Sequence, residues 1–81
     1  MRIQEELNKY IHISSQILGG TPVFRNTRVP VKNLFDYLKA GENLNEFLEN
    51  FPSVSKELAL NVLNLAEYMV EHKEGEDEAA A

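Results

Sequence analysis

Residues 23–31 read VFRNTRVPV, and this stretch indicates how the chain folds. Two short β-prone runs flank Arg25-Asn26-Thr27, and asparagine tolerates the left-handed backbone that tight turns require. Pro22 and Pro30 stand at the two ends, where a missing backbone donor does no harm. We therefore expect a small β-hairpin here, and a further short strand at residues 10–13, where apolar and polar residues alternate.

After the hairpin, the apolar spacing changes to that of helices. Val31, Leu34, Phe35 and Leu38 fall on one helical stripe, and Gly41 suits the position just past the end of that helix. A second helix is expected over about residues 44–50 with Asn43 as its cap, and a third over about residues 56–71 with Ser55 as its cap. The predicted fold class is α+β and mostly α: a short N-terminal hairpin followed by a three-helix unit of the helix-turn-helix type. An ordinary small helical bundle would have the same helix lengths.

The length and composition limit the class of protein. A chain of 81 residues has room for one domain, and 43% hydrophobic with 26% charged residues is a globular balance. The absence of cysteine excludes disulfides and thiolate chemistry. No apolar run reaches the ~18–20 residues of a membrane span, and the N-terminus is too polar for a secretory signal, so we expect a cytoplasmic protein without a membrane partner. We divide the chain into an N-terminal arm (1–9), a single domain (10–71) and an acidic, disordered tail (72–81).

The charge is distributed unevenly along the chain. The net charge is −5, and residues 71–81 contribute five acidic side chains and one lysine, so that the rest of the chain is almost neutral. Residues 25–39 contain four basic residues and one acidic residue, a local excess of positive charge. Because affinity for phosphate depends on lysine and arginine, any contact with nucleic acid is expected at this basic segment or at the start of the third helix. The candidate DNA-binding residues are Arg25, Arg28, Lys32, Lys56, Asn61 and Asn64.

These candidates have plainer alternatives. The basic residues of the hairpin could form a solvated rim, or Arg28 could pair with an acid of another element. Lys56 is the only basic residue on the exposed start of the third helix, and Glu57 beside it would repel phosphates. Asn61 and Asn64 have side chains that can pair with adenine edges.

The third helix is apolar over an unusually large part of its circumference. One stripe contains Leu58, Val62, Leu65 and Met69, and an adjoining stripe contains Ala59, Leu63, Ala66 and Val70. Both stripes could enter one core. Since a domain this small can cover only one side of the helix, we instead expect the second stripe to form the interface of a homodimer. A core of this size also supplies only ~3–5 kcal/mol, which favours self-association.

The sequence contains no set of residues that points to catalysis. His12 and His72 lie far apart and neither has a second histidine at metal-ligand spacing, so we predict no metal site and no cofactor. The serines lack the glycines of a nucleophile elbow. No catalytic residue is predicted, and the protein is expected not to be an enzyme.

Residues 17–31, ILGGTPVFRNTRVPV, resemble the signature of the domain-of-unknown-function 433 family. The resemblance continues through Ala40-Gly41 and Phe51-Pro52, which match the ends of two family helices, and Ser55, which opens the last one. The chain departs from the family at Ser15-Gln16, where Asp-Pro is usual, and at Asn26, where glycine is favoured. The resemblance implies a helix-turn-helix-like domain of the homeodomain or winged-helix kind.

The resemblance also implies a function, because many family members look like antitoxins of type II toxin–antitoxin pairs. The implied partners are a ribonuclease-like toxin with a PIN-like fold and, as a second ligand, operator DNA. The expected function is therefore that of a non-enzymatic antitoxin-like protein. The alternative is a dimeric protein-interaction module without DNA binding.

Overall fold

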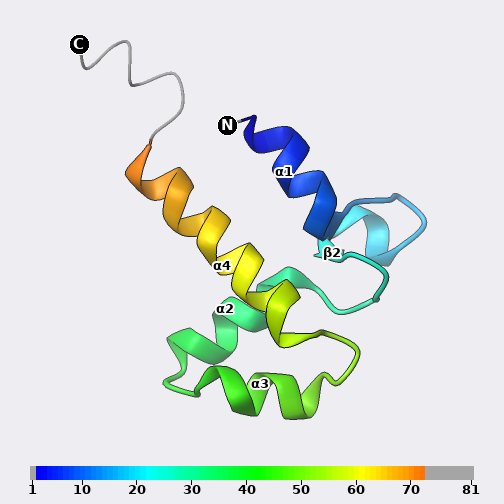
Figure 1. The fold of residues 1–81 in the computed structure, drawn as a ribbon. Coiled ribbons are helices and arrows are strands. Elements are labelled where there is room, and N and C mark those ends of the chain that lie inside the picture. The colour runs from blue at the N-terminus through cyan, green and yellow to red at the C-terminus, as the bar shows by residue number, and fades with distance from the viewer. Residues whose placement is uncertain (1, 73–81) are drawn as a thin grey trace.

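The computed structural model describes residues 2–72. A pair of two-residue strands, β1 (Ile11–His12) and β2 (Val23–Phe24), joins an N-terminal helix to three further helices (Figure 1). The strands are antiparallel, with Ile11 opposite Phe24 and His12 opposite Val23. Between them lies a 3-10 turn, η1 (Leu18–Gly20). The α+β, mostly helical fold class and the short strand within residues 10–13 are confirmed.

The turn after β2 forms as expected, but the segment that returns from it, residues 29–30, is shorter than a strand. Asn26 adopts the predicted left-handed backbone, with a φ of 66°. Thr27 Oγ1 donates to the Phe24 carbonyl at 2.9 Å and accepts from the Val29 N–H at 3.0 Å. This segment pairs with β2 through a single antiparallel bridge, between Val23 and Pro30. The pairing goes no further because Pro30 has no N–H to donate and because a helix begins at the next residue. The partner strand of β2 is therefore β1.

The three predicted helices are present with the predicted caps. They are α2 (Val31–Lys39), α3 (Leu44–Asn50) and α4 (Lys56–Glu71). Asn43 Oδ1 accepts from the Glu46 N–H at 2.8 Å, and Ser55 Oγ accepts from the Leu58 N–H at 3.0 Å. Each cap stabilises its helix by about 1 kcal/mol. Gly41, with a φ of 89°, ends α2 as expected, and its left-handed backbone lets the next residue bond back to the helix.

The core lies where α2, α3 and the first half of α4 meet the turn after β2. Its buried side chains are Phe24, Val31, Leu34, Phe47, Val54, Ala59 and Val62. Phe47 is at the centre: its ring is 5.9 Å from that of Phe24, 5.5 Å from that of Tyr37 and 5.0 Å from that of Phe51. These spacings are those of favourable aromatic pairs. A seven-residue helix, α3, is thereby fixed to the rest of the domain.

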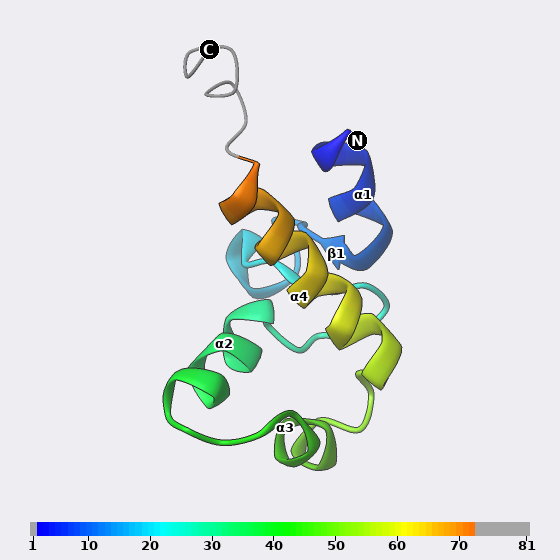
Figure 2. The same ribbon diagram turned by 60° about the vertical axis from the view of Figure 1, so that its left-hand side comes forward.

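The first nine residues are more than an arm, because residues 3–10 form a helix, α1 (Ile3–Tyr10). Figures 1 and 2 show α1 lying antiparallel to the second half of α4, at the end of the molecule opposite α3. None of its residues is fully buried. The helical signals in these residues are weak, and the helix is held in place by contacts from residues distant in the chain. The predicted acidic tail lies outside the described residues, except for His72.

No helix within residues 2–72 is long and apolar enough to cross a membrane. In the same part of the chain, no group of three or more histidine, aspartate or glutamate side chains could hold a metal ion.

Candidate functional site

The largest hollow described lies beneath the turn that follows β2. It is open to solvent, has a volume of ≈ 590 Å³, and is lined by His12, Ile17, Arg25, Asn26, Thr27, Arg28 and Ser53. We call this the basic hollow. Two of these residues carry a permanent positive charge, and no residue that lines it in the described part of the chain is acidic. An anion is the ligand that such a lining favours.

Arg25 is fixed in this hollow by contacts with α1 and β1. Its Nη2 donates to the carbonyls of Asn8 and Ile11, and its Nη1 lies 3.3 Å from His12 Nδ1. The Asn8 carbonyl belongs to the last turn of α1, where carbonyl groups lack partners within the helix and a cation is favourable. The sequence predicts Arg25 as a phosphate contact, and what the structure shows is that this side chain holds the end of α1.

Arg28, the second predicted phosphate contact, projects from the turn. Its side chain is exposed and forms no ion pair with any residue between positions 2 and 72. The alternative prediction, an ion pair between Arg28 and an acid of another element, is thus not seen in that part of the chain. Arg28 keeps its donors available to a ligand in the basic hollow.

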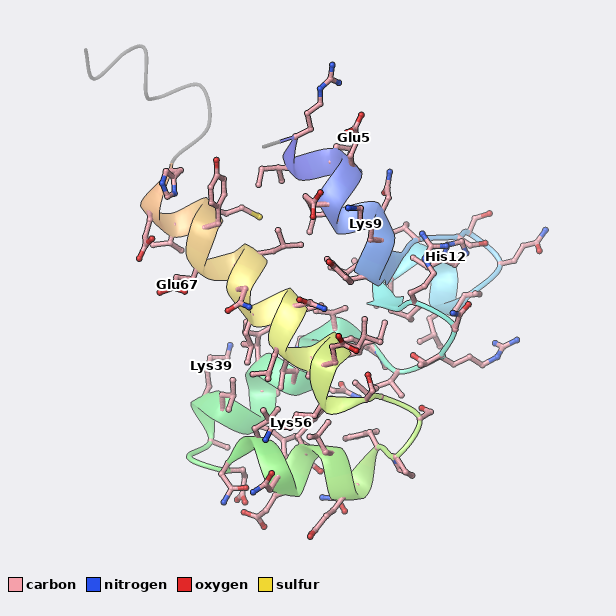
Figure 3. The ribbon with its side chains drawn as sticks, viewed as in Figure 1. Glu5, Lys9, His12, Lys39, Lys56 and Glu67 are labelled. Atoms are coloured by element: carbon pink, nitrogen blue, oxygen red, sulfur yellow. The ribbon has the colours of Figure 1, made fainter. Side chains whose placement is uncertain are left out.

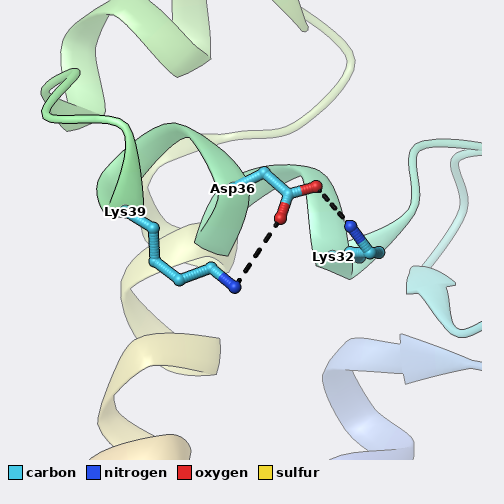
Figure 4. A network of polar contacts seen from close by, with 3 residues as sticks. All are labelled: Lys32, Asp36 and Lys39. Atoms are coloured by element: carbon cyan, nitrogen blue, oxygen red, sulfur yellow. Dashed lines mark hydrogen bonds and ion pairs between the residues drawn. The ribbon is translucent and has the colours of Figure 1, made fainter.

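Lys32 does not line this hollow. Its Nζ lies 2.6 Å from Asp36 Oδ2 one helical turn along α2, and Lys39 Nζ lies 4.0 Å from the other oxygen of the same carboxylate (Figure 4). The hydrogen bond from Lys32 lowers the pKa of Asp36, and the charge of Lys39 lowers it further. Because Asp36 neutralises the charge of Lys32 locally, Lys32 is less available to an anion than Arg28 is.

The predicted residues on α4 are not gathered into one surface. Asn61 is half-buried and lines a second hollow of ≈ 420 Å³, which Arg25 and Glu57 also line. Lys56 extends on the other side of the start of α4, away from β1 and His12 (Figure 3). Asn64 is exposed and lines neither hollow. Of the six candidates, the structure therefore brings together Arg25 with Arg28, and Arg25 with Asn61.

The solvent side of α4 is acidic, which sequence spacing alone did not reveal. Its exposed residues at helical spacing are Glu57, Leu60, Asn64, Glu67 and Glu71, and we call them the outer face of α4. This face carries three carboxylates and no basic residue, so it would be repelled by the phosphates on either side of a DNA groove. Leu60 contributes apolar surface, with 40% of its area exposed.

The residues predicted for a dimer interface differ in exposure, from buried near the start of α4 to exposed near its end. Ala59 is fully buried in the core of its own protomer, and Leu63 packs against that core. Ala66 is half-buried, and Val70 is 73% exposed. The side chain of Ala59 is therefore out of reach of a second chain. The apolar surface that α4 leaves accessible begins near Ala66 and includes Met69, which is 44% exposed.

Four residues of the basic hollow are not predictable from the sequence pattern: His12, Ile17, Thr27 and Ser53. His12 and Ser53 come from elements far apart in the chain, and no spacing signal links them to the turn. Thr27 lies within the stretch 23–31, where its residue type indicates turn geometry and no ligand, whereas its neighbour Asn26 is predicted as part of a nucleic-acid surface on the hairpin. The alternation of apolar and polar residues around His12 indicates a strand, as observed. It does not indicate that the His12 ring contacts Arg25.

Comparisons with known proteins agree with this fold. The profile of DUF433, described as a protein of unknown function, matches residues 11–66. An uncharacterized protein from Sinorhizobium fredii, y4eO, is 48% identical over 44 residues, which cover 54% of this chain and 20% of that protein. This chain thus matches about a fifth of the length of that relative.

A solved structure is similar over almost the whole chain. The crystal structure of a DUF433 member protein from Anabaena variabilis superposes with a TM-score of 0.62 at 29% sequence identity. The match covers 94% of this chain and 72% of the other. The hairpin string, the helix order and the profile match agree, and the chain belongs to the DUF433 family.

Proposed function

We propose that this protein is a non-enzymatic, antitoxin-like binding protein of the cytoplasm whose partner is a small, basic, ribonuclease-like toxin. The observation that carries the proposal is the outer face of α4, which presents three exposed carboxylates along its length and the exposed side chain of Leu60 near its start. The family resemblance supports the same class of function.

The chemistry of this face fits a protein that binds an RNA-cleaving partner. A ribonuclease must present a positive surface to its substrate, and a rigid acidic helix can occupy that surface. Leu60, one turn after Glu57, would supply apolar contact near the start of the face, while Glu57, Glu67 and Glu71 would steer the encounter and set its orientation.

The test is co-purification with the product of a neighbouring nuclease-like reading frame, together with rescue of growth when that nuclease is expressed. Replacing Glu57, Glu67 and Glu71 by glutamine should slow association roughly tenfold or more at low salt. A matched control replaces three exposed glutamates near α3, Glu42, Glu46 and Glu49, and should leave association unchanged. Equal effects of both triple variants would reject α4 as the contact.

The proposal includes a homodimer formed through the second half of α4. Val70 and Met69 are exposed there, and Leu63 and Ala66, nearer the core, are half-buried. Val70→Glu should yield a monomer that keeps its helical content, because Val70 makes no core contact. Light scattering measures the outcome, and a variant that remains dimeric would place the interface elsewhere.

Operator binding is a second candidate function, favoured by the basic hollow rather than by α4. The turn carrying Arg25 and Arg28 would contact the DNA backbone, which positions a protein without reading sequence. Titration with the upstream DNA at low salt and at about 150 mM salt tests this, since a sequence-specific complex keeps its discrimination at the higher concentration. If the protein binds the DNA at neither salt concentration, operator binding is rejected and the protein-interaction function is the one that remains.

A further inference from the structure

We propose that the basic hollow is a binding site for a single phosphate group. This inference is independent of the proposed toxin contact, because the hollow and the outer face of α4 share no residue. It would give a molecular basis to operator binding but does not require it.

The first argument is that Arg25 is already held in place. Its guanidinium has five N–H donors, and three of them are directed at Asn8, Ile11 and His12. Two donors, Nε–H and one Nη1–H, remain for a ligand in the hollow that Arg25 lines. An arginine fixed by other bonds loses little side-chain entropy when an anion arrives, so its contribution to binding is larger than that of a mobile one.

The second argument is that further donors surround the same space. Arg28 is exposed and unpaired within residues 2–72, and its planar guanidinium can bind two phosphate oxygens at once. Asn26 and Ser53 also line the hollow, and neither side chain forms a hydrogen bond with a residue in that range. The Thr27 hydroxyl is occupied by the turn itself and serves to hold its shape.

The third argument concerns charge and size. Arg25 and Arg28 share the hollow with His12 and with no acidic residue of the described chain, so their positive charges are not compensated there. The volume of ≈ 590 Å³ is open and far larger than one phosphate ion. The site can therefore accept a phosphate group that belongs to a larger molecule, either a nucleic-acid backbone or a small phosphorylated compound, as well as free phosphate.

The experiment uses the full chain labelled with ¹⁵N and titrated with inorganic phosphate. We expect saturable shifts of the backbone amides of Asn26, Arg28 and Ser53, with sodium chloride at the same ionic strength as the reference. Arg28→Gln should weaken phosphate binding about tenfold, the effect of losing one charge-assisted pair. Lys32→Gln, which removes a neighbouring charge outside the hollow, is the matched control and should bind as well as the parent.

A second titration distinguishes the sources of the phosphate group. If a nucleic-acid backbone is the ligand, a short DNA duplex shifts the same amides and inorganic phosphate competes with it. If the ligand is a small phosphorylated compound, inorganic phosphate still saturates the site and the duplex leaves these amides unchanged. Shifts that follow ionic strength alone, or that are equal in the parent and Arg28→Gln, would overturn the proposal whatever the result for the toxin.

Discussion

The two short helices of this molecule, α1 and α3, are held by different means. They differ by one residue in length and lie at opposite ends of the fold (Figures 1 and 2). Helix α3 begins at a side-chain cap and buries Phe47 completely. Helix α1 has no side-chain cap and no fully buried residue. Arg25, fifteen residues after its end, donates to the Asn8 carbonyl in its last turn and to the carbonyl of Ile11, the residue that follows it. Helix α3 thus combines a local cap with a buried side chain of its own, whereas α1 has neither and is held by a residue from outside the helix.

The largest effect is expected where α3 meets the core. Phe47→Ala removes the ring that contacts Phe24, Tyr37 and Phe51, and should destabilise the domain by about 3–5 kcal/mol. A domain of this size has little more stability than that, so the variant should be largely unfolded by circular dichroism at about 25 °C. Leu60→Ala, on the exposed side of α4, is the control and should unfold at nearly the parent's urea midpoint. A folded Phe47→Ala protein would mean that α3 is held by something other than its aromatic contacts.

The next effect separates the two helices. Arg25→Gln removes the charged donors to the Asn8 and Ile11 carbonyls, an interaction of roughly 1.5–3 kcal/mol. The amides of α1 should exchange with deuterium about 10- to 100-fold faster, while those of α3 keep their protection. Arg28→Gln, three residues away and without these contacts, should change neither helix. Uniformly faster exchange in both helices would show that Arg25 supports the whole fold rather than α1.

A smaller effect tests the caps. Asn43→Ala removes the acceptor of the Glu46 N–H and should lower the free energy of unfolding by about 1 kcal/mol. The corresponding position of α1 is Arg2, whose side chain makes no capping hydrogen bond, so Arg2→Ala should leave the urea midpoint almost unchanged. Equal losses in the two variants would contradict the difference between the helices.

This contrast explains how much of the structure could be predicted. The caps Asn43 and Ser55, the left-handed Asn26 and the apolar spacing of α2 to α4 act within a few residues, and each was predicted correctly. Helix α1 was not, because its stabilising partner is Arg25. Two residues of the basic hollow, Arg25 and Arg28, are candidates from the sequence because they stand close together in a basic segment, whereas His12 and Ser53 reach the hollow only through the pairing of β1 with β2 and the connection before α4.

The smallest effect concerns the charge at the start of α3. A side-chain hydrogen bond with Glu42 raises the pKa of Glu46, and repulsion between the two carboxylates raises it further. A raised pKa in the folded state means a contribution to stability that is present below the pKa of the unfolded chain and is lost as the pH rises through the folded value. The pKa of Asp36 shifts in the opposite direction, because the hydrogen bond from Lys32 lowers it. Its contribution to stability is therefore present above the pKa of the unfolded chain and is lost as the pH falls through the folded value.

Glu42→Gln should therefore lower the pKa of Glu46, because glutamine is uncharged and its amide can donate to the ionised carboxylate. Carboxyl ¹³C shifts followed by NMR between about pH 3 and about pH 7 measure both groups in one titration. The pKa of Asp36 is the internal reference and should not move, since its partners Lys32 and Lys39 lie on α2. If the pKa of Glu46 stays raised in this variant, Glu42 is not its cause, and neither is the start of α3, because the start of a helix by itself lowers the pKa of a carboxyl group.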